Sequence, residues 1–284
     1  MKFVEIDYGE GVTLKGYLFE KSPSLPNIDS RPIVVVCPGG GYEHCSDREA
    51  DPVALYFAGQ GFNTFVFRYS LHEKAAFPQP LVELSRAVKD IRANGEKWDI
   101  ATDRIAVCGF SAGAHLAASL GTLWNLPEVQ EKSGCVGEEN RPNALVLGYP
   151  VTNSRSWMAS HIDRLVGDRD REETIHLLNT DEQVGPHTPP AFIFHTYFDQ
   201  VVAVEDSLCF ANAMAKNNLP FELHIFTNGK HGMSLGNELV DFNEPEAAEW
   251  SGFAANWLWK LFGRPDKQPL TLDADRKHPV ETVK

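Results

Sequence analysis

Short apolar runs alternate with longer periodic segments along most of the chain, and this pattern predicts its secondary structure. Near the N-terminus, residues 3–8 and 13–20 alternate apolar with polar side chains, as half-exposed antiparallel strands near a sheet edge do. Further along, mostly apolar runs rich in Val, Ile and Phe indicate buried strands. The other predicted strands cover residues 32–39, 62–70, 104–110, 143–150, 189–197 and 220–229.

Segments with helical periodicity lie between these strands. The clearest is residues 80–98, in which Leu81, Leu84 and Val88 fall broadly on one face. The other predicted helices cover residues 49–60, 111–124, 204–217 and 246–263. Strands that alternate with helices imply right-handed crossovers, so the sequence predicts the α/β class, with a mostly parallel central sheet and helices on both faces.

We expect a single domain over residues 1–263. The chain of 284 residues could hold two small domains, but no internal repeat or low-complexity linker divides it. Residues 151–190 are polar and irregular, with a short helical piece at 171–179, and we interpret them as a small insertion over the strand ends. Residues 264–284 form a polar tail that contains proline.

Composition narrows the choice of partner and compartment. The formal net charge of −13, without a Lys/Arg run, makes nucleic acid and anionic membranes poor partners. No segment approaches the roughly 18 apolar residues of a membrane span. The N-terminal stretch carries Glu5, Asp7 and Glu10 and does not read as a signal peptide. We therefore expect a cytoplasmic protein.

The five cysteines give no sign of a metal site or a disulfide framework. Their number is odd, their spacing is wide, and no CxxC pair occurs. Cys37 and Cys108 lie within predicted buried strands and are expected to be core residues. We expect neither a metal nor any other cofactor.

The five residues 109–113, Gly-Phe-Ser-Ala-Gly, match the G-x-S-x-G pattern between a predicted strand and a predicted helix. This is the context of a nucleophile elbow, a turn so sharp that side chains two positions to either side of the serine would collide. Such a turn would expose Ser111 Oγ and set the Ala112 N–H at a helix N-terminus, where a developing oxyanion is favoured. A plain small-residue turn is the alternative interpretation.

Three consecutive glycines, residues 39–41, follow the strand at 32–39. They do not form the phosphate-binding pattern G-x-G-x-x-G, because residue 44 is histidine, and no G-x-x-x-x-G-K-[S/T] is present. An oxyanion loop fits better, with Gly40 and Gly41 donating their N–H groups where no Cβ intervenes. A simple glycine turn is the alternative interpretation. Tyr42 and His44 come next and could contact a substrate.

A base and an acid follow Ser111 in the order that this type of sheet requires, Ser then Asp then His. Asp199 comes just after the strand at 189–197, and His231 lies on a loop between Gly229 and Gly232. Since parallel α/β sheets carry their sites at the carboxyl ends of the strands, we expect His231 to reach Ser111 and to be oriented by Asp199.

The remaining histidines and acids fit structural roles better. His195 and His224 lie inside predicted strands, and His115 is four residues beyond Ser111 on the same helical face. We favour packing or local hydrogen bonding for all three, with a place in the wall of the site as the alternative for His115. Glu205 and Asp206 open a predicted helix and are interpreted as capping or first-turn acids.

The segments VVVCPGGGY, FNTFVFRYS and WDIATDRIAVCGFSAGAHLAASLGT, with the region from PPAFIFHTY to GKHGMSL, carry a family resemblance over residues 30–240. The chain resembles the α/β-hydrolases, and within them the bacterial acetyl-xylan esterase-like and short-chain carboxylesterase group. The resemblance implies Ser111 as nucleophile, Asp199 as acid and His231 as base. It also implies oxyanion donors at Gly40, Gly41 and Ala112.

One departure concerns substrate class. Many lipase- and esterase-type relatives carry His before the three glycines, where this chain has Pro38, and this favours the acetyl-sugar-esterase side. The expected function is metal-independent hydrolysis of short-chain, acetyl esters through an acyl-enzyme, and the expected partner is a small-molecule ester such as an acetylated sugar or xylo-oligosaccharide. An amidase, peptidase or formamidase, or a non-catalytic ligand-binding homologue, are the alternatives. The sequence does not determine the oligomeric state, and a homo-oligomer is one of the possibilities.

Overall fold

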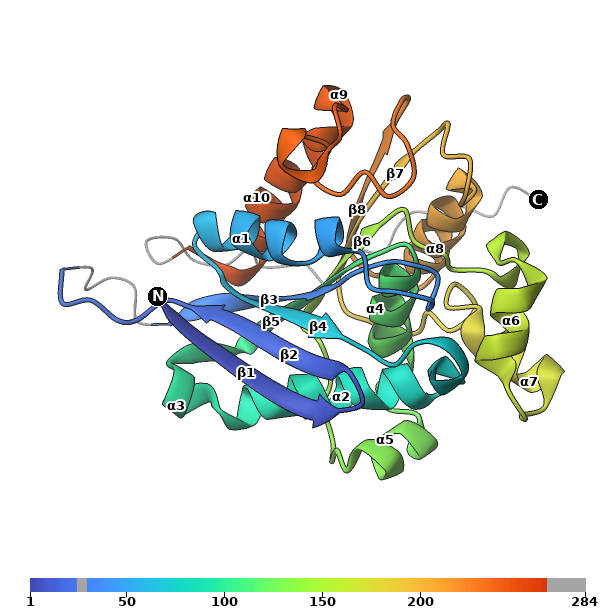
Figure 1. Ribbon diagram of the computed structural model, residues 1–284, viewed down its shortest axis with the longest axis horizontal. Helices are drawn as coiled ribbons and strands as arrows, with labels where there is room; N and C mark the ends of the chain where they lie inside the picture. Colours follow the sequence, from blue (N-terminus) through green and yellow to red (C-terminus); the bar gives the residue numbers. More distant parts are fainter. Residues whose placement is uncertain (25–29, 265–284) are drawn as a thin grey trace.

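A computed structural model describes residues 1–24 and 30–264, which build a central eight-stranded sheet (Figure 1). The strand order is β1-β2-β4-β3-β5-β6-β7-β8. β1 pairs antiparallel with β2, β2 pairs antiparallel with β4, and the other neighbours are parallel. The strands are β1 (Lys2–Gly9), β2 (Val12–Leu18), β3 (Arg31–Cys37), β4 (Asn63–Arg68), β5 (Ile100–Phe110), β6 (Ala144–Gly148), β7 (Ala191–Thr196) and β8 (Phe221–Phe226).

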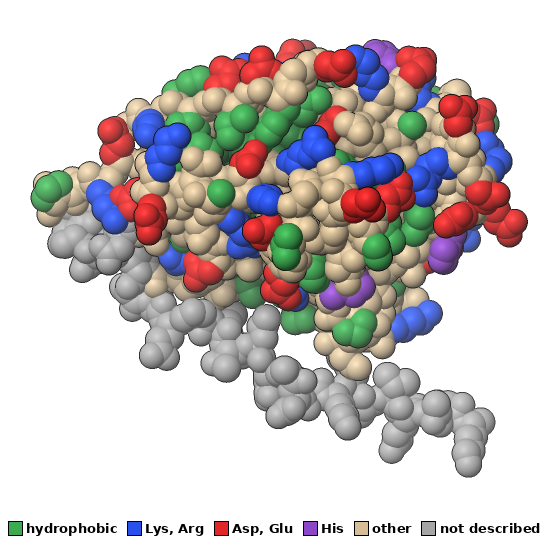
Figure 2. Space-filling model, turned by 90° about the horizontal axis from the view of Figure 1, so that it is seen from below, with side chains coloured by type: hydrophobic (Ala, Val, Ile, Leu, Met, Phe, Trp, Pro, Cys, Tyr) green, Lys and Arg blue, Asp and Glu red, His purple; other side chains and the backbone are tan. Residues whose placement is uncertain are grey.

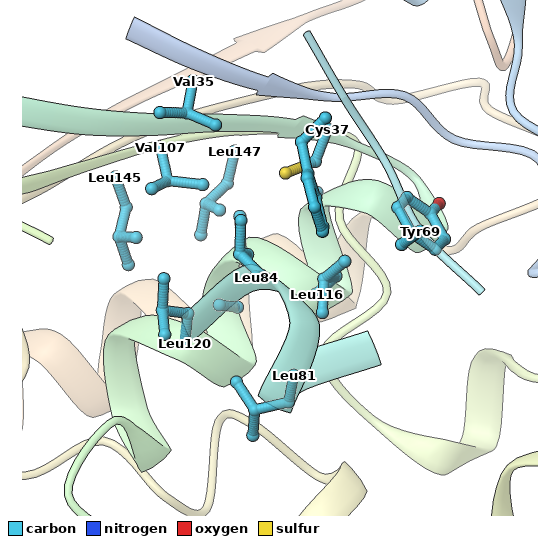
Figure 3. Close-up of a cluster of buried hydrophobic side chains, with 14 of the residues drawn as sticks. Val35, Cys37, Tyr69, Leu81, Leu84, Val107, Leu116, Leu120, Leu145 and Leu147 are labelled. Atoms are coloured by element: carbon cyan, nitrogen blue, oxygen red, sulfur yellow. The ribbon is translucent and has the colours of Figure 1, made fainter. Parts of the chain in front are cut away.

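Helices cover both faces of the sheet, as the apolar character of the central strands requires. α1 (Asp51–Gly59) and α10 (Trp250–Phe262) pack on the face that includes Val34 and Val36. α2 (Gln79–Ala93), α4 (Ala112–Leu123) and α8 (Val204–Lys216) pack on the opposite face. Figure 3 shows this second core, where Val35, Val107 and Leu145 from the strands meet leucines of α2 and α4. The predicted α/β fold is confirmed.

The shorter elements lie around this frame. The remaining α-helices are α3 (Gly95–Trp98), α5 (Pro127–Ser133), α6 (Ala159–Val166), α7 (Arg171–Leu178) and α9 (Pro245–Ala248). Single 3-10 turns form η1 (Asp47–Glu49), η2 (His72–Ala75), η3 (Ser154–Ser156) and η4 (Glu238–Val240). Of these, η1, η3 and α6 contribute residues to the pocket described below.

Two predicted helices are broken in the structure. The segment 80–98 divides into α2 and α3 at Asn94, whose side-chain amide donates to the Asp90 carbonyl. A Cβ on Gly95, the first residue of α3, would lie 2.4 Å from Thr102 Cγ2, so glycine lets the chain pass this close to β5. The C-terminal helix likewise begins at Trp250, after the separate turn α9. The helices α5 and α6 were not predicted, because both are short and α5 is also largely polar.

Acidic and basic side chains are interspersed on the face seen in Figure 2, without a single large basic field. Among the described residues, no helix has both the length and the apolar character needed to cross a bilayer. Apart from Arg264, the tail predicted at 264–284 lies outside the described residues.

Candidate active site

Ser111 occupies a sharp turn between β5 and α4. Its φ of +52° is rare for a residue with a side chain, and its N–H donates to the Gly148 carbonyl of β6 at 3.0 Å. A Cβ on Gly109 would lie 2.2 Å from the Gly113 oxygen, and a Cβ on Gly113 would lie 2.1 Å from the Cys37 oxygen. Both glycines of the G-x-S-x-G pattern are therefore required by close backbone approach.

His231 bridges Ser111 and Asp199. Its Nε2 lies 2.8 Å from Ser111 Oγ, and its Nδ1 lies 2.7 Å from Asp199 Oδ2. The loop that carries the histidine is tied to β7, because Thr196 Oγ1 donates to the Gly229 carbonyl at 2.9 Å. With Nδ1 donating to the carboxylate, Nε2 is left to accept the serine proton. Three residues from distant parts of the chain thus form one hydrogen-bonded relay.

The side chain of Asp199 is fully buried and well supplied with hydrogen-bond donors. Its Oδ1 accepts the N–H groups of Val201 and Val202 at 2.8 and 3.0 Å, and His195 Nε2 lies 3.5 Å from its Oδ2. Burial by itself would raise the pKa of Asp199, but the contacts with His195 and His231 outweigh it and hold the pKa below its usual value. The group is therefore a carboxylate at neutral pH and favours a positive charge on His231.

The glycine loop lies beside Ser111. The Gly39 N–H is bound by Glu49 Oε2 at 2.8 Å, whereas Gly40 and Gly41 border the same pocket as Ser111. Gly40 has a φ of +128°, and a Cβ there would lie 2.2 Å from the His44 oxygen. Ala112, the third donor implied by the resemblance, is the first residue of α4.

A pocket of about 600 Å³ opens above these residues. The segment 151–190 supplies part of its wall, through Trp157, Met158 and His161. This segment is tied to the glycine loop, since Glu43 Oε1 lies 3.3 Å from Arg164 Nη1 and 3.6 Å from His161 Nε2. The pocket wall therefore combines an apolar side with polar and charged groups.

Tyr42 and His44, which follow the three glycines, lie in different environments. His44 is exposed and lines the pocket. Tyr42 does not line it, which corrects the expected substrate contact. Its side chain is buried, its hydroxyl is 2.9 Å from His115 Nδ1, and its ring packs against Trp157. Because the positive φ of Tyr42 turns the chain, the ring enters the core behind the pocket wall.

The other histidines have local partners. His115 Nε2 is 3.0 Å from the Leu178 carbonyl, and burial lowers the pKa of His115 to about 4, so the ring is neutral. His195 Nδ1 contacts Ser207 Oγ at 2.8 Å, and His224 Nε2 contacts Glu222 at 2.8 Å. His195, however, also reaches the acid of the relay, which its position in a strand did not indicate.

Glu205 and Asp206 lie in the first turn of α8, as predicted, but Asp206 also binds a distant segment of the chain. It is buried at the start of α8, where its Oδ2 accepts the N–H groups of Thr152 at 2.7 Å and Asn153 at 3.2 Å. Its Oδ1 accepts the Ser156 hydroxyl. The carboxyl thereby fastens the start of the segment 151–190 to the domain.

Two site-adjacent residues were missed by sequence reasoning, Glu49 and Tyr149. Glu49 is only 2% exposed, and Tyr149, just after β6, is fully buried with its ring centroid 5.0 Å from that of His231. The Tyr149 hydroxyl donates to Glu49 Oε1 at 2.6 Å. A glutamate just before a helix is ordinarily solvated, so the pattern gave no signal of its burial. Across the described residues, no group of three or more His, Cys, Asp or Glu side chains is arranged to hold a metal ion.

The sheet order, the elbow after β5 and the Ser–His–Asp relay at the carboxyl ends of the strands define an α/β hydrolase. More narrowly, the chain belongs to the BD-FAE family, whose model matches residues 24–214.

Named relatives point in the same direction. The chain is 37% identical over 224 residues to endo-1,4-beta-xylanase B of Butyrivibrio fibrisolvens, a match that covers 75% of this chain and 34% of that protein. It is 29% identical over 221 residues to an acetylxylan esterase of Xylanibacter ruminicola, covering 75% of this chain and 43% of the relative. The chain thus spans between a third and a half of the length of these curated relatives.

Solved structures match over nearly the whole chain. The acetyl ester-xyloside bifunctional hydrolase from Caldicellulosiruptor lactoaceticus is 33% identical, with a TM-score of 0.75 and coverage of 89% of this chain and 88% of that one. The carboxylesterase Cest-2923 from Lactobacillus plantarum has a TM-score of 0.82 over 92% of this chain and 98% of that one. At 24% identity, this second likeness supports the fold alone.

Proposed function

We propose that the protein is a serine esterase that hydrolyses short-chain esters, acetyl esters first. The observation that carries the proposal is the continuous relay from Ser111 Oγ through His231 to Asp199, beside the glycine loop. The esterases among the relatives support the same reaction class.

In the proposed reaction, Ser111 Oγ attacks the ester carbonyl carbon while His231 Nε2 takes the hydroxyl proton. The carbonyl oxygen becomes negative, and the N–H groups of Gly40, Gly41 and Ala112 are the proposed donors to it. His231 then gives its proton to the leaving alcohol, and an acyl-serine remains. A water molecule, deprotonated by the same nitrogen, releases the acid and restores the serine. Asp199 stabilises the imidazolium in both halves.

Acetylated sugars or xylo-oligosaccharides are the proposed alcohol side. The pocket offers an indole at Trp157 and polar groups at His44, His161 and Gln200, a combination that suits a hydroxyl-rich substrate. The acetylxylan esterase and the acetyl ester-xyloside hydrolase among the relatives are named for such esters.

The test is hydrolysis of p-nitrophenyl esters from acetate to octanoate, with acetylated xylobiose alongside. We expect activity to fall with acyl length and to drop at least roughly 10⁴-fold in Ser111→Ala, because the nucleophile is removed. Deacetylation of xylobiose would support the sugar assignment. No ester turnover by folded wild type, with turnover of an amide or formamide instead, would overturn the proposal.

A further inference from the structure

One buried carboxyl group beside the site has no role in the proposed chemistry. Glu49 lies at the end of η1, and each of its two oxygens accepts a separate hydrogen bond. Oε2 accepts the Gly39 N–H at 2.8 Å, and Oε1 accepts the Tyr149 hydroxyl at 2.6 Å. Burying a carboxyl group costs free energy, and burial raises the pKa of Glu49 accordingly. The two hydrogen bonds of Glu49 offset part of this cost, and we ask what these bonds hold in place.

The first of these bonds fixes the glycine loop. A Cβ on Gly39 would lie 2.7 Å from Glu49 Oε2 and 3.0 Å from Ser111 Cβ, so the carboxyl, the loop and the serine turn are in direct contact. The Gly39 N–H is held by the carboxyl, and the next two peptides, those of Gly40 and Gly41, border the pocket. The hydrogen bond to Gly39 therefore fixes the position of the backbone from which the proposed oxyanion donors, Gly40 and Gly41, follow.

The second bond leads to the histidine. The Tyr149 ring packs edge-on against the His231 ring, with the centroids 5.0 Å apart. Its hydroxyl also accepts the Ser234 N–H at 3.0 Å, three residues beyond His231. A second link closes the same junction, since Ser234 Oγ donates to the Arg48 carbonyl, next to Glu49. Glu49 and Tyr149 thus connect two loops. One loop carries His231, and the other carries the proposed oxyanion donors.

We propose that Glu49 and Tyr149 are positioning residues that hold the oxyanion loop and His231 in a fixed relation to Ser111. This inference rests on the proposed esterase function. Neither residue exchanges a proton with the substrate. They act by keeping the glycine loop and His231 aligned with each other. Stabilisation of a transition state requires that such groups be held close to their productive geometry.

The test compares Glu49→Gln, Tyr149→Phe and the double variant with wild type, all in the full chain. Glutamine has nearly the same shape but one acceptor oxygen, so it cannot accept from both Gly39 and Tyr149. Phenylalanine keeps the ring against His231 and removes only the hydroxyl. The matched control is Glu83→Gln. Glu83 is also a buried glutamate that accepts a backbone N–H, that of Ser70 at 2.9 Å, but it does not line the pocket.

Active sites are counted with a fluorophosphonate, and kcat and KM for p-nitrophenyl acetate are measured per active site. We expect Glu49→Gln to lower kcat roughly 10- to 100-fold with KM within about threefold of wild type. Tyr149→Phe should lower kcat in the same direction. The double variant should lose no more than about threefold beyond Glu49→Gln, since both changes break one linkage. Glu83→Gln should keep kcat per site within about twofold, even where its melting temperature falls.

Wild-type kcat per active site in both Glu49→Gln and Tyr149→Phe would overturn the proposal, as would an equal loss in Glu83→Gln. If Glu49→Gln does not fold, Tyr149→Phe decides, because it keeps the ring and most of the packing. If wild type turns over no ester, the proposed function fails on its own. The rate of fluorophosphonate labelling at Ser111 in the same variants then still measures the alignment of serine and histidine, and an unchanged rate would overturn the positioning role.

Discussion

Single residues in this protein are constrained by how closely backbone passes backbone. Gly113 and Gly252 both lie in helices, α4 and α10, where alanine has the higher intrinsic propensity. Their surroundings differ. At Gly113 a Cβ would lie 2.1 Å from the Cys37 oxygen and 2.4 Å from the Pro38 oxygen, whereas at Gly252 the nearest neighbour is a Tyr56 hydroxyl at 3.9 Å.

The same substitution should therefore have opposite effects at the two positions. Gly252→Ala should raise the free energy of unfolding by about 0.5–1 kcal/mol, as expected for a helix interior. Gly113→Ala should lower it by about 1–3 kcal/mol or more, because strand and helix backbone must separate. Urea unfolding of both variants checks this. A rise in the free energy of unfolding in both variants would show that propensity outweighs backbone contact at Gly113.

At the scale of elements, the sequence predicted the strands and the positions of the site residues along the chain. It did not predict the tertiary contacts around them. Buried parallel strands give apolar runs, and Ser111 and Asp199 each follow such a run, whereas His231 follows the half-exposed edge strand β8. Strand pattern and chain order were sufficient to place all three. The close approach of Gly95 to Thr102 is a tertiary contact, which no local pattern contains. Burial of Tyr42 depends equally on distant partners.

α4 is linked to its neighbours through His115, which contacts Tyr42 and the carbonyl of Leu178 at the end of α7. Burial lowers the pKa of His115 to about 4, below the value near 6.5 expected in the unfolded chain. The unfolded chain therefore binds the proton more strongly, and stability falls as the pH drops from about 6.5 to about 4.

The expected loss from His115 is about 3 kcal/mol in total, since each pH unit between the two pKa values corresponds to about 1.4 kcal/mol. His115→Asn is less stable at pH 7, because contacts are lost, but it lacks this pH-dependent loss. Its deficit relative to wild type should shrink between pH 7 and pH 4. Urea unfolding at several pH values measures both proteins, and parallel curves would contradict the assignment.

At the scale of the whole molecule, part of the pocket wall is a segment, residues 151–190, that is fastened to the domain at a few points. Asp206 on α8 binds the N–H groups of Thr152 and Asn153 and the hydroxyl of Ser156, directly before Trp157. The contacts of Glu43 with His161 and Arg164 fasten the same segment to the glycine loop.

Asp206→Asn should loosen this wall without changing the relay. Its amide has a single acceptor oxygen, so the buried N–H groups of Thr152 and Asn153 lose charge-assisted bonds at a cost of about 1–3 kcal/mol. Hydrogen exchange should become faster over residues 151–158 while β3, β5 and β6 stay protected. Uniformly faster exchange across the sheet would show instead that the carboxyl supports the entire domain.

The distance along the chain between Ser111 and His231, 120 residues, also has a consequence for synthesis. The serine and the glycine loop emerge from the ribosome well before Asp199 and His231. Under the proposed mechanism, a nascent chain that ends before β7 holds Ser111 without its proposed base, and we expect it not to be acylated by esters. We expect the proposed activity to appear only after the C-terminal part of the sheet has added β7 and β8, so its gain would report that the last parallel strands have docked.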